Sequence, residues 1–363
     1  MREAESKSER IVRELLAEYA SGRQAPGVAL PGEQTLARRF GVARETVRKA
    51  LDELQRQGVV ERRKGAGTFL SEGSARKTGL IGFLVPDLGA SGFFGDVHRE
   101  MEKLAAGNGY RLSVATIQPA DAETMIRETR RRARELAVAR VEGVVFRPLL
   151  DERCAKVNRE VVRIFEHTET PVVLLDADVV EPPERSACDL VSVNNVEAGR
   201  QVAVHLLSRG YRRIGFLMNG PSIGTNSNWR NRLFGVAGEL ALRGCETAVR
   251  MLTFDPRDVA SVRRHLGQRG RQDAVVCGND ETAAALVRSL AAVGVRVPEE
   301  VAVVGFDDQP AALRCDPPLT TVRQPTALIA KSALSALLAR IRHPNSPARE
   351  INLRAPIVIR RST

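Results

Sequence analysis

The chain has 363 residues, which is too long for one ordinary domain and fits two or three. Hydrophobic residues make up 43%, enough for globular cores, but aromatic residues make up only 4%, so those cores must be aliphatic. The net charge of +11 favours a polyanionic partner, and residues 1–78 alone hold 16 Lys and Arg against 11 Asp and Glu.

Several classes of protein are disfavoured by what the sequence lacks. The N-terminal segment is charged and precedes no apolar run, so we expect no signal peptide, and no stretch approaches the ~18 apolar residues of a membrane span. The five cysteines form no CxxC pair, which favours free thiols in a reducing compartment, and the five histidines show no metal-ligand spacing. We therefore expect a cytoplasmic protein with no membrane contact, no metal and no cofactor.

The first 70 residues show three short amphipathic helices followed by a hairpin. The helices are predicted at residues 8–20, 33–40 and 44–57, and the strands at 59–63 and 68–70. Gly41-Val42 makes a tight turn between the second and third helices, and the turn Lys64-Gly65-Ala66-Gly67 joins the strands. This order is the outline of a winged helix-turn-helix.

The third predicted helix carries its arginines and its apolar residues on opposite faces. Val47, Leu51 and Leu54 anchor one face, so Arg44 and Arg48 should point outward, free of acids of their own domain. Arginine there can donate two hydrogen bonds to guanine, worth about 1–3 kcal/mol of discrimination. A solvated basic face on an ordinary surface helix is the alternative, and the turn and hairpin around it weigh against that alternative. Flanking phosphate contacts are expected from Arg38, Arg39, Arg62, Arg63 and Lys64.

The segment LPGEQTLARRFGVARETVRKALDELQRQGVVERRKGAGTFL resembles the GntR family of bacterial winged-helix regulators, over about residues 8–70. The resemblance implies base or phosphate contacts by Arg44, Thr46 and Arg48, and a wing tip that reaches the minor groove. The family usually has serine caps where this chain has Gly32 and Ala43; Ala43 cannot cap through its side chain, at a cost of about 1 kcal/mol. The candidate DNA contacts are Glu33, Arg38, Arg44, Thr46, Arg48, Lys49, Lys64, Gly65, Gly67 and Thr68.

Residues 71–78 read as a flexible linker, and from Gly79 onward apolar strands alternate with amphipathic helices. This pattern predicts an α/β fold with parallel sheets covered on both faces, and there are enough units for two lobes. Strands are expected at residues 80–85, 112–116, 144–146, 172–175, 190–193, 214–218, 274–276 and 301–305. Helices are expected at residues 94–106, 197–208, 232–242 and 282–293, and the arginine-rich run 127–140 is expected to be a solvated helix face with pairs such as Glu128–Arg132.

Polar residues directly after strands are the candidates for a ligand site, because the carboxyl ends of parallel strands converge. The candidates that follow strands are Asp87, Arg147, Asp176, Asn279, Asp280 and Asp307. Four further candidates are Arg232, which opens a predicted helix, Gln324, which lies at a predicted lobe crossing, and the aromatic residues Phe94 and Trp229. Carboxylates and arginines suit a neutral polyol, and Phe94 or Trp229 could stack on a sugar ring. Structural roles stay open: Asp280 can cap the following helix, Asp308 can stabilise its loop, Arg147 can pair with an acid, and the two aromatic rings can simply pack.

The second part of the chain also resembles a known family. Four segments are similar to the LacI/GalR effector-binding domain, a type I periplasmic-binding-protein-like fold. They are IGFLVPDLGASGFFGDVHREMEKLAAGNGYRL, VSVNNVEAGRQVAVHLLSRGYRRIGFL, VVCGNDETAAALVRSLAAVGVRVPEEVAVVGFDD and PPLTTVRQP. The resemblance covers about residues 79–361 and implies two lobes joined by three crossing strands, with a ligand-binding arginine at Arg232 ahead of Gly235. The lobes are expected at 79–188 plus 325–343 and at 190–323 plus 348–361. A GntR-type head on such a body is the architecture of arabinose repressors, although the effector need not be arabinose.

These features predict a transcriptional repressor that binds double-stranded operator DNA as a homodimer, formed through the effector domain and controlled by a sugar. A regulator that responds to a non-sugar metabolite such as a purine is the first alternative, and the sign of the ligand's effect is open. A GntR-headed enzyme is the second, but no GxSxG, P-loop or GxGxxG after a strand is present, so we expect no enzyme. A transport binding protein is disfavoured by the fused DNA-binding head.

Overall fold

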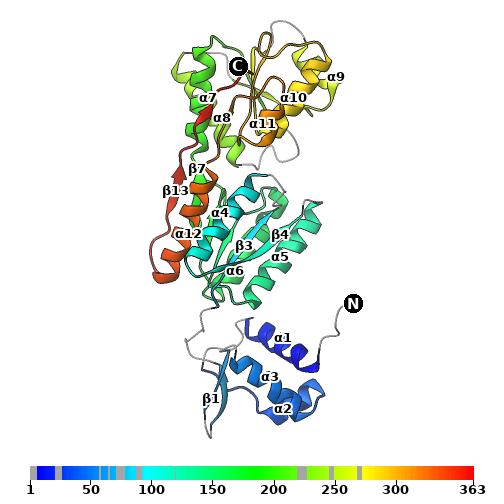
Figure 1. Cartoon of the computed structure of the whole chain (residues 1–363), viewed down its shortest axis with the longest axis vertical. Coiled ribbons are helices and arrows are strands. Elements are labelled where there is room, and N and C mark those ends of the chain that lie inside the picture. Colours follow the sequence, from blue (N-terminus) through cyan, green and yellow to red (C-terminus); the bar gives the residue numbers. More distant parts are fainter. Residues whose placement is uncertain are drawn as a thin grey trace.

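The computed structural model describes residues 6–20, 27–56, 59–63, 66–70, 78–86, 92–118, 120–218, 227–244, 249–267 and 272–363. Figure 1 shows a small N-terminal head at one end of the long axis and the two lobes of a larger body beyond it. The expected linker lies almost wholly outside the described residues. Among the described helices, none is long and apolar enough to cross a membrane.

The head is a three-helix winged domain, as predicted. It contains α1 (Lys7–Ala20), α2 (Glu33–Phe40), α3 (Arg44–Arg56), β1 (Val60–Arg63) and β2 (Gly67–Leu70). Its core is a separate aliphatic cluster around Ile11, Leu36, Val47 and Leu54, so amphipathic burial fixes the helices against each other. β1 and β2 pair antiparallel to form the wing, and Gly41 adopts the left-handed φ of +64° that the turn between α2 and α3 requires.

The first lobe is a six-stranded parallel sheet covered on both faces by helices. Its strand order is β13-β7-β6-β5-β3-β4. The strands are β3 (Leu80–Pro86), β4 (Arg111–Ile117), β5 (Gly143–Phe146), β6 (Val172–Leu175), β7 (Asp189–Val193) and β13 (Glu350–Leu353). One face carries α5 (Ala122–Val138) and α6 (Ala155–Glu166), and the other carries α4 (Phe93–Gly107) and α12 (Thr326–Arg342). A 3-10 turn, Glu152–Cys154, precedes α6.

The second lobe is a four-stranded parallel sheet in the order β11-β10-β8-β9. Its strands are β8 (Ile214–Leu217), β9 (Arg250–Leu252), β10 (Ala274–Cys277) and β11 (Ala302–Val304). Its helices are α7 (Asn195–Ser208), α8 (Ser227–Leu242), α9 (Val259–Leu266), α10 (Asp280–Ala292) and α11 (Pro310–Arg314). A short antiparallel pair, β12 (Thr321–Val322) and β14 (Ile357–Val358), completes it. All eight strands expected from apolar runs are present, within about two residues at their ends.

Two expected boundaries need correction. β7 and β13 pair with each other, and β7 pairs with β6, so residues 190–193 and 350–353 extend the first sheet instead of opening the second lobe at 190 and 348. A short apolar strand is buried in either sheet, so its hydrophobicity does not reveal its partner. In addition, α8 begins at Ser227, earlier than the expected start at residue 232.

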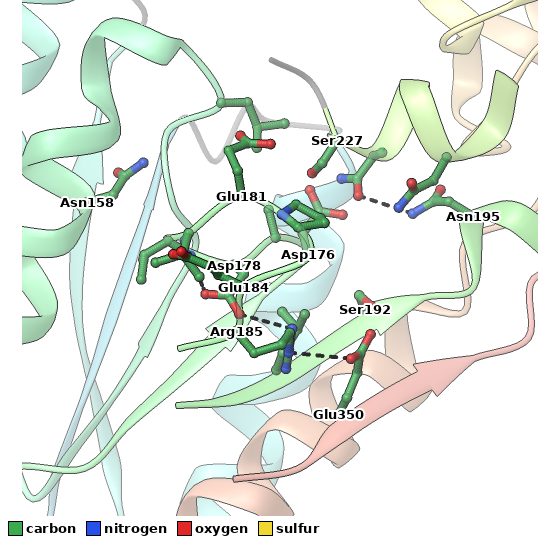
Figure 2. Close-up of a pocket in the computed structure, with 18 of the residues that line it drawn as sticks. Asn158, Asp176, Asp178, Glu181, Glu184, Arg185, Ser192, Asn195, Ser227 and Glu350 are labelled. Carbon is green, nitrogen blue, oxygen red and sulfur yellow. Dashed lines mark hydrogen bonds and ion pairs between the residues drawn. The ribbon is translucent and has the colours of Figure 1, made fainter. Parts of the chain in front are cut away.

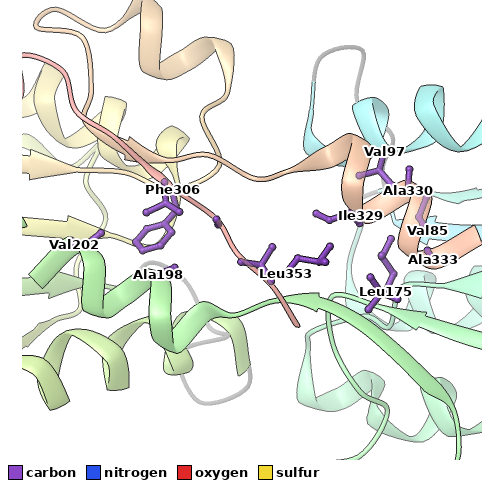
Figure 3. Packing of buried hydrophobic residues seen from close by; sticks show 14 of the residues in the cluster. Val85, Val97, Leu175, Ala198, Val202, Phe306, Ile329, Ala330, Ala333 and Leu353 are labelled. Carbon is purple, nitrogen blue, oxygen red and sulfur yellow. The ribbon is translucent and has the colours of Figure 1, made fainter. Parts of the chain in front are cut away.

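The two lobes share one apolar cluster at their junction. Figure 3 shows Ala198, Val202 and Phe306 of the second lobe on one side, Leu353 in the middle, and Val85 of the first lobe among side chains on the other side. In the second lobe, α7 and α8 cross at two glycines: a Cβ added to Gly199 or Gly235 would overlap backbone atoms of the facing helix. This close crossing sets the position of the N-terminal half of α8, which carries Arg232.

Candidate DNA-contact surface and effector cleft

The two arginines of α3 lie on its exposed face but are not free of acids. The side chain of Arg44 is 72% exposed and its Nε lies 2.8 Å from Glu33 Oε2; that of Arg48 is 54% exposed and its Nη2 lies 3.3 Å from Glu45 Oε1. The outward direction agrees with the sequence analysis, and the absence of acidic partners was predicted wrongly. Exposed pairs of this kind contribute about 0–1 kcal/mol, so a phosphate or a guanine can replace the carboxylate.

Glu33 links the recognition helix to the wing. Besides Arg44, its carboxylate lies 3.7 Å from Arg62 Nη2, and Arg62 Nη1 in turn lies 2.8 Å from Asp52 Oδ1. Its side chain is only 21% exposed. Glu33 therefore holds arginines in place, and its expected contact with DNA stays a prediction.

The other candidate DNA contacts surround this face. Arg38 and Lys49 are exposed, Thr46 is half-buried, and Arg38 and Thr46 line a shallow groove along the turn from α2 to α3. Gly67 is exposed and has a φ of +113°, and Thr68 is half-buried beside it in the wing. Lys64 and Gly65, at the expected wing tip, lie outside the described residues.

Most of the arginine-rich run lies in α5, where several arginines pair with acids of the same helix and Arg130 pairs with Glu160 of α6. Arg131 contacts Glu128 and Glu135, and Arg132 Nη1 lies 3.1 Å from Glu135 Oε2. The solvated face is thus present, but Glu128 pairs with Arg131 and not with Arg132 as expected. In the head, α1 lies against this helix.

On the first lobe, Arg147 and Asp176 form a largely buried ion pair. Arg147 Nη2 lies 3.1 Å from Asp176 Oδ2, and the guanidinium lies 5.1 Å from the centre of the Phe94 ring. Asp176 directly follows β6 and has a φ of +72°, a left-handed backbone conformation that is uncommon for residues other than glycine. The open alternative that Arg147 pairs with an acid is correct, and the acid is itself a candidate site residue.

On the second lobe, Arg232 is almost fully buried at the centre of a polar cluster. Its Nε donates to Asn195 Oδ1 at 2.8 Å and its Nη1 donates to the Gly278 carbonyl at 2.6 Å. Its Nη2 lies 3.7 Å from Asp307 Oδ1, which also accepts a hydrogen bond from Gln324 Nε2 at 3.0 Å. The Gln324 Oε1 atom is buried and has no hydrogen-bond partner among the described residues, which leaves an acceptor for a ligand donor.

The two clusters belong to one cleft. Burial raises the pKa of Asp307, and the charge of Asp176 on the opposite lobe raises it further, against the lowering effects of Arg232 and Gln324. Asp176 of the first lobe lines the same cavity as Asn195 of the second lobe, whose Oδ1 accepts from Arg232. The structure therefore brings Arg147, Asp176, Arg232, Asp307 and Gln324 together.

Asp280 and Asn279 both have structural roles. Asp280 Oδ1 accepts from Thr321 Oγ1 at 2.6 Å and Oδ2 accepts from the Gln309 amide at 2.7 Å. Burial, with a further contribution from Asp307, raises the pKa of Asp280 to about 8. Asn279 caps α10 by accepting from the Thr282 amide. Both oxygens of Asp280 are thus occupied by protein donors, which speaks against its expected contact with the effector. Asn279 uses only its Oδ1 for the cap, so its expected contact with the effector stays a prediction.

The remaining candidates divide between packing and the cleft. Trp229 covers Gly278 so closely that an added Cβ would overlap its ring, and Phe94 contacts Arg147. Asp308 binds Arg323 and Arg360 and stabilises its loop, as the alternative had it. Asp87 lies outside the described residues.

A cavity of about 370 Å³ adjoins these clusters, between the two lobes. Figure 2 shows Asp176, Asn195 and Ser227 around it, with the loop 176–185 on one side. Sequence reasoning missed Asn195, although it follows the apolar strand 190–193 and the rule that found Asp176 applies to it equally. Among the described residues, no group of three His, Cys, Asp or Glu side chains could hold a metal ion.

A winged helix-turn-helix with exposed arginines, joined to a two-lobed body with a polar interlobe site, defines a DNA-binding transcriptional regulator. Residues 7–70 match the family model of bacterial regulatory proteins of the gntR family, and residues 203–363 match that of the periplasmic binding protein-like domain. The chain belongs to the HTH-type transcriptional regulators that combine these two domains.

Three known proteins illustrate this likeness. The chain is 27% identical to an arabinose metabolism transcriptional repressor of Geobacillus stearothermophilus, over 97% of this chain and 96% of that one. It is 32% identical to an uncharacterized HTH-type transcriptional regulator of the aml 5' region of Streptomyces limosus, over 79% and 80% of the two chains. The solved complex of the transcriptional regulator CelR with cellobiose superposes with a TM-score of 0.66 at 25% identity, over 92% of this chain and 100% of that one.

Proposed function

We propose that this protein is a homodimeric repressor whose binding to operator DNA is controlled by a neutral sugar in the interlobe cleft. The observation that carries the proposal is the facing arrangement of Arg147 and Asp176 on one lobe and Arg232, Asp307 and Gln324 on the other. Each arginine lies beside a carboxylate, so the site is close to neutral overall. Carboxylate and amide oxygens accept from hydroxyl groups, while arginines donate to ring and hydroxyl oxygens.

The similar proteins support a sugar as the effector. One of them is a repressor of arabinose metabolism, and the solved structure contains cellobiose. A protein that binds operator DNA acts in the cytoplasm, and the proposal assigns it no catalytic turnover. Two copies fit the proposal because two heads read two half-sites related by a two-fold axis.

Control of DNA binding requires the sugar to favour one arrangement of the lobes. A ligand that contacts both lobes binds most tightly when they are close, so it shifts the population toward that arrangement. When the lobes close, the lobe beside the head changes its position, and the distance between the two heads of a dimer changes as a result. Only such a difference in affinity between the two arrangements can change operator binding.

The test is a thermal-shift screen of neutral sugars and purine bases on the full-length protein, followed by a gel shift on DNA upstream of its gene. A sugar present at 100 times its dissociation constant should add about 2.7 kcal/mol of apparent stability and change the gel shift. Asp307→Asn should abolish the sugar response and keep DNA binding. Stabilisation by a purine and by no sugar would overturn the choice of effector.

A further inference from the structure

The cavity between the lobes continues the cleft and does not stand apart from it. Asp176 lines the cavity and also pairs with Arg147. Asn195 lines it too, and its Oδ1 accepts from Arg232. A ligand held by Arg232 and Asp307 can therefore extend past these two residues into a volume of about 370 Å³. A single small substituent on the ligand would not fill this volume.

The first turns of α8 supply hydrogen-bonding groups to this volume. Ser227, Asn228 and Asn231 all line the cavity, and α8 continues directly to Arg232. Asn228 accepts from Asn195 through its Oδ1, whereas the side chains of Ser227 and Asn231 make no hydrogen bond within the part of the chain that the structure describes. Asn228 and Arg232 are four residues apart, just over one turn or about 6 Å along the helix, which is comparable to the length of one sugar ring.

The charges around the cavity select against anions. Its lining contains seven carboxylates and the two arginines Arg159 and Arg185. The carboxylates stay in excess even when the arginines outside the lining that pair with three of them are counted, namely Arg147, Arg153 and Arg230. Arg185 is already engaged, with its Nη1 3.0 Å from Asp178 and its Nε 3.6 Å from Glu350. A uronate or a phosphate ester would thus meet repulsion here, while hydroxyl groups would find acceptors.

From these observations we propose that the cavity binds a second sugar unit, so that the effector is a neutral disaccharide or longer oligosaccharide. The first unit occupies the cluster around Arg232 and Asp307, and the second lies against Ser227 and Asn231 on α8. The inference rests on the proposed function, because it takes the first unit to be a sugar. It adds the size and the charge of the effector, which the fold alone does not give.

The experiment compares neutral disaccharides with their component monosaccharides on the full-length protein. Isothermal titration uses glucose with cellobiose and maltose, xylose with xylobiose, and arabinose with arabinobiose. One disaccharide should bind at least about tenfold more tightly than its monosaccharide, which corresponds to about 1.4 kcal/mol. In Asn231→Leu this disaccharide should lose about tenfold in affinity, while the monosaccharide changes less than about twofold.

The matched control is Asn345→Leu, an exposed asparagine in the turn after α12 and away from the cavity, which should change neither affinity. Unfolding midpoints without ligand verify that both variants fold. A monosaccharide that binds as tightly as every disaccharide overturns the second unit and leaves the proposed function intact. The same holds if Asn231→Leu weakens both ligands equally. If no sugar binds and a purine does, the proposed function itself fails.

Discussion

At the scale of single residues, the head and the cleft use arginine in two ways. Arg48 is exposed and weakly paired with Glu45, so it can exchange its partner for DNA. Arg232 is buried, donates to Asn195 and to the Gly278 carbonyl, and packs 4.4 Å from the Phe306 ring centre, so it is held in one position. The exposed Arg48 can rearrange when DNA binds, whereas the buried Arg232 belongs to a binding site that is formed before the ligand arrives.

Removal of Arg48 should weaken operator binding without affecting the cleft. Arg48→Ala removes a donor to base edges, and we expect at least about a fivefold loss in operator affinity, or about 1 kcal/mol. Fluorescence anisotropy with labelled operator measures it, and effector titration should remain unchanged. Arg99→Ala is the control, because Arg99 is also an exposed arginine paired with an acid three residues away, but on the body. An equal loss in both variants would contradict a specific role for Arg48.

The carboxyl of Asp280 should make stability depend on pH. Its pKa is raised to about 8 in the folded protein, whereas an aspartate in the unfolded chain has a pKa near 4. The contribution of the protonated carboxyl to the free energy of unfolding is therefore fully present below pH 4 and is lost as the pH rises through about 8. In Asp280→Asn this loss disappears. The free energy of unfolding of the wild type relative to the variant should fall between pH 5 and pH 8 by more than about 1.4 kcal/mol, the value of one pKa unit. Urea unfolding at each pH measures it, and parallel curves would contradict the raised pKa.

At the scale of helices and strands, the sequence predicts most of the architecture and only part of the site. Apolar runs located the strands, and the polar residues after them led to Arg147, Asp176 and Asp307. The same rule also selected Asp280, because spacing cannot show that Thr321 and the Gln309 amide already supply its hydrogen bonds. Pairing partners far apart in the chain, such as β7 with β13, are likewise invisible to local periodicity.

The crossing of α7 and α8 should tolerate no side chain at its glycines. In Gly235→Ala the added methyl group overlaps backbone atoms of α7, and we expect a loss of about 1–3 kcal/mol in the free energy of unfolding. Gly238→Ala, on the same helix, meets nothing within 4 Å and should stabilise by about 0.5–1 kcal/mol. Urea unfolding followed by circular dichroism compares the two. Equal stabilities would mean that the helices can move apart at no cost.

At the scale of the whole molecule, the lobes are joined by chain crossings, a shared apolar cluster and one ion pair across the cavity rim. Arg230 of α8 lies 2.8 Å from Glu181, which belongs to the loop after β6 of the first lobe. The apolar cluster provides a junction about which the lobes stay packed, whereas the ion pair is exposed to solvent and salt. This pair therefore favours the described arrangement of the lobes over more open ones.

Loss of this pair should weaken effector binding modestly. In Glu181→Gln more open arrangements gain population, and a ligand that contacts both lobes should lose up to about fivefold in affinity, or about 1 kcal/mol. The double exchange Glu181→Arg with Arg230→Glu should restore it. Titrations at low and high salt measure the effect, which should shrink at high salt. If Glu181→Gln bound the effector more tightly than the wild type, the ion pair would oppose the arrangement of the lobes that binds the effector, and the prediction would be wrong.

Within the described parts of the chain, the aliphatic core of the head contains no side chain from the body. Neither part therefore needs the other's interior in order to fold, and a gene fusion that replaced one reading head by another would leave the sensing lobes chemically unaltered. Recombination between regulators can in this way change which operator is read while the recognised metabolite stays the same.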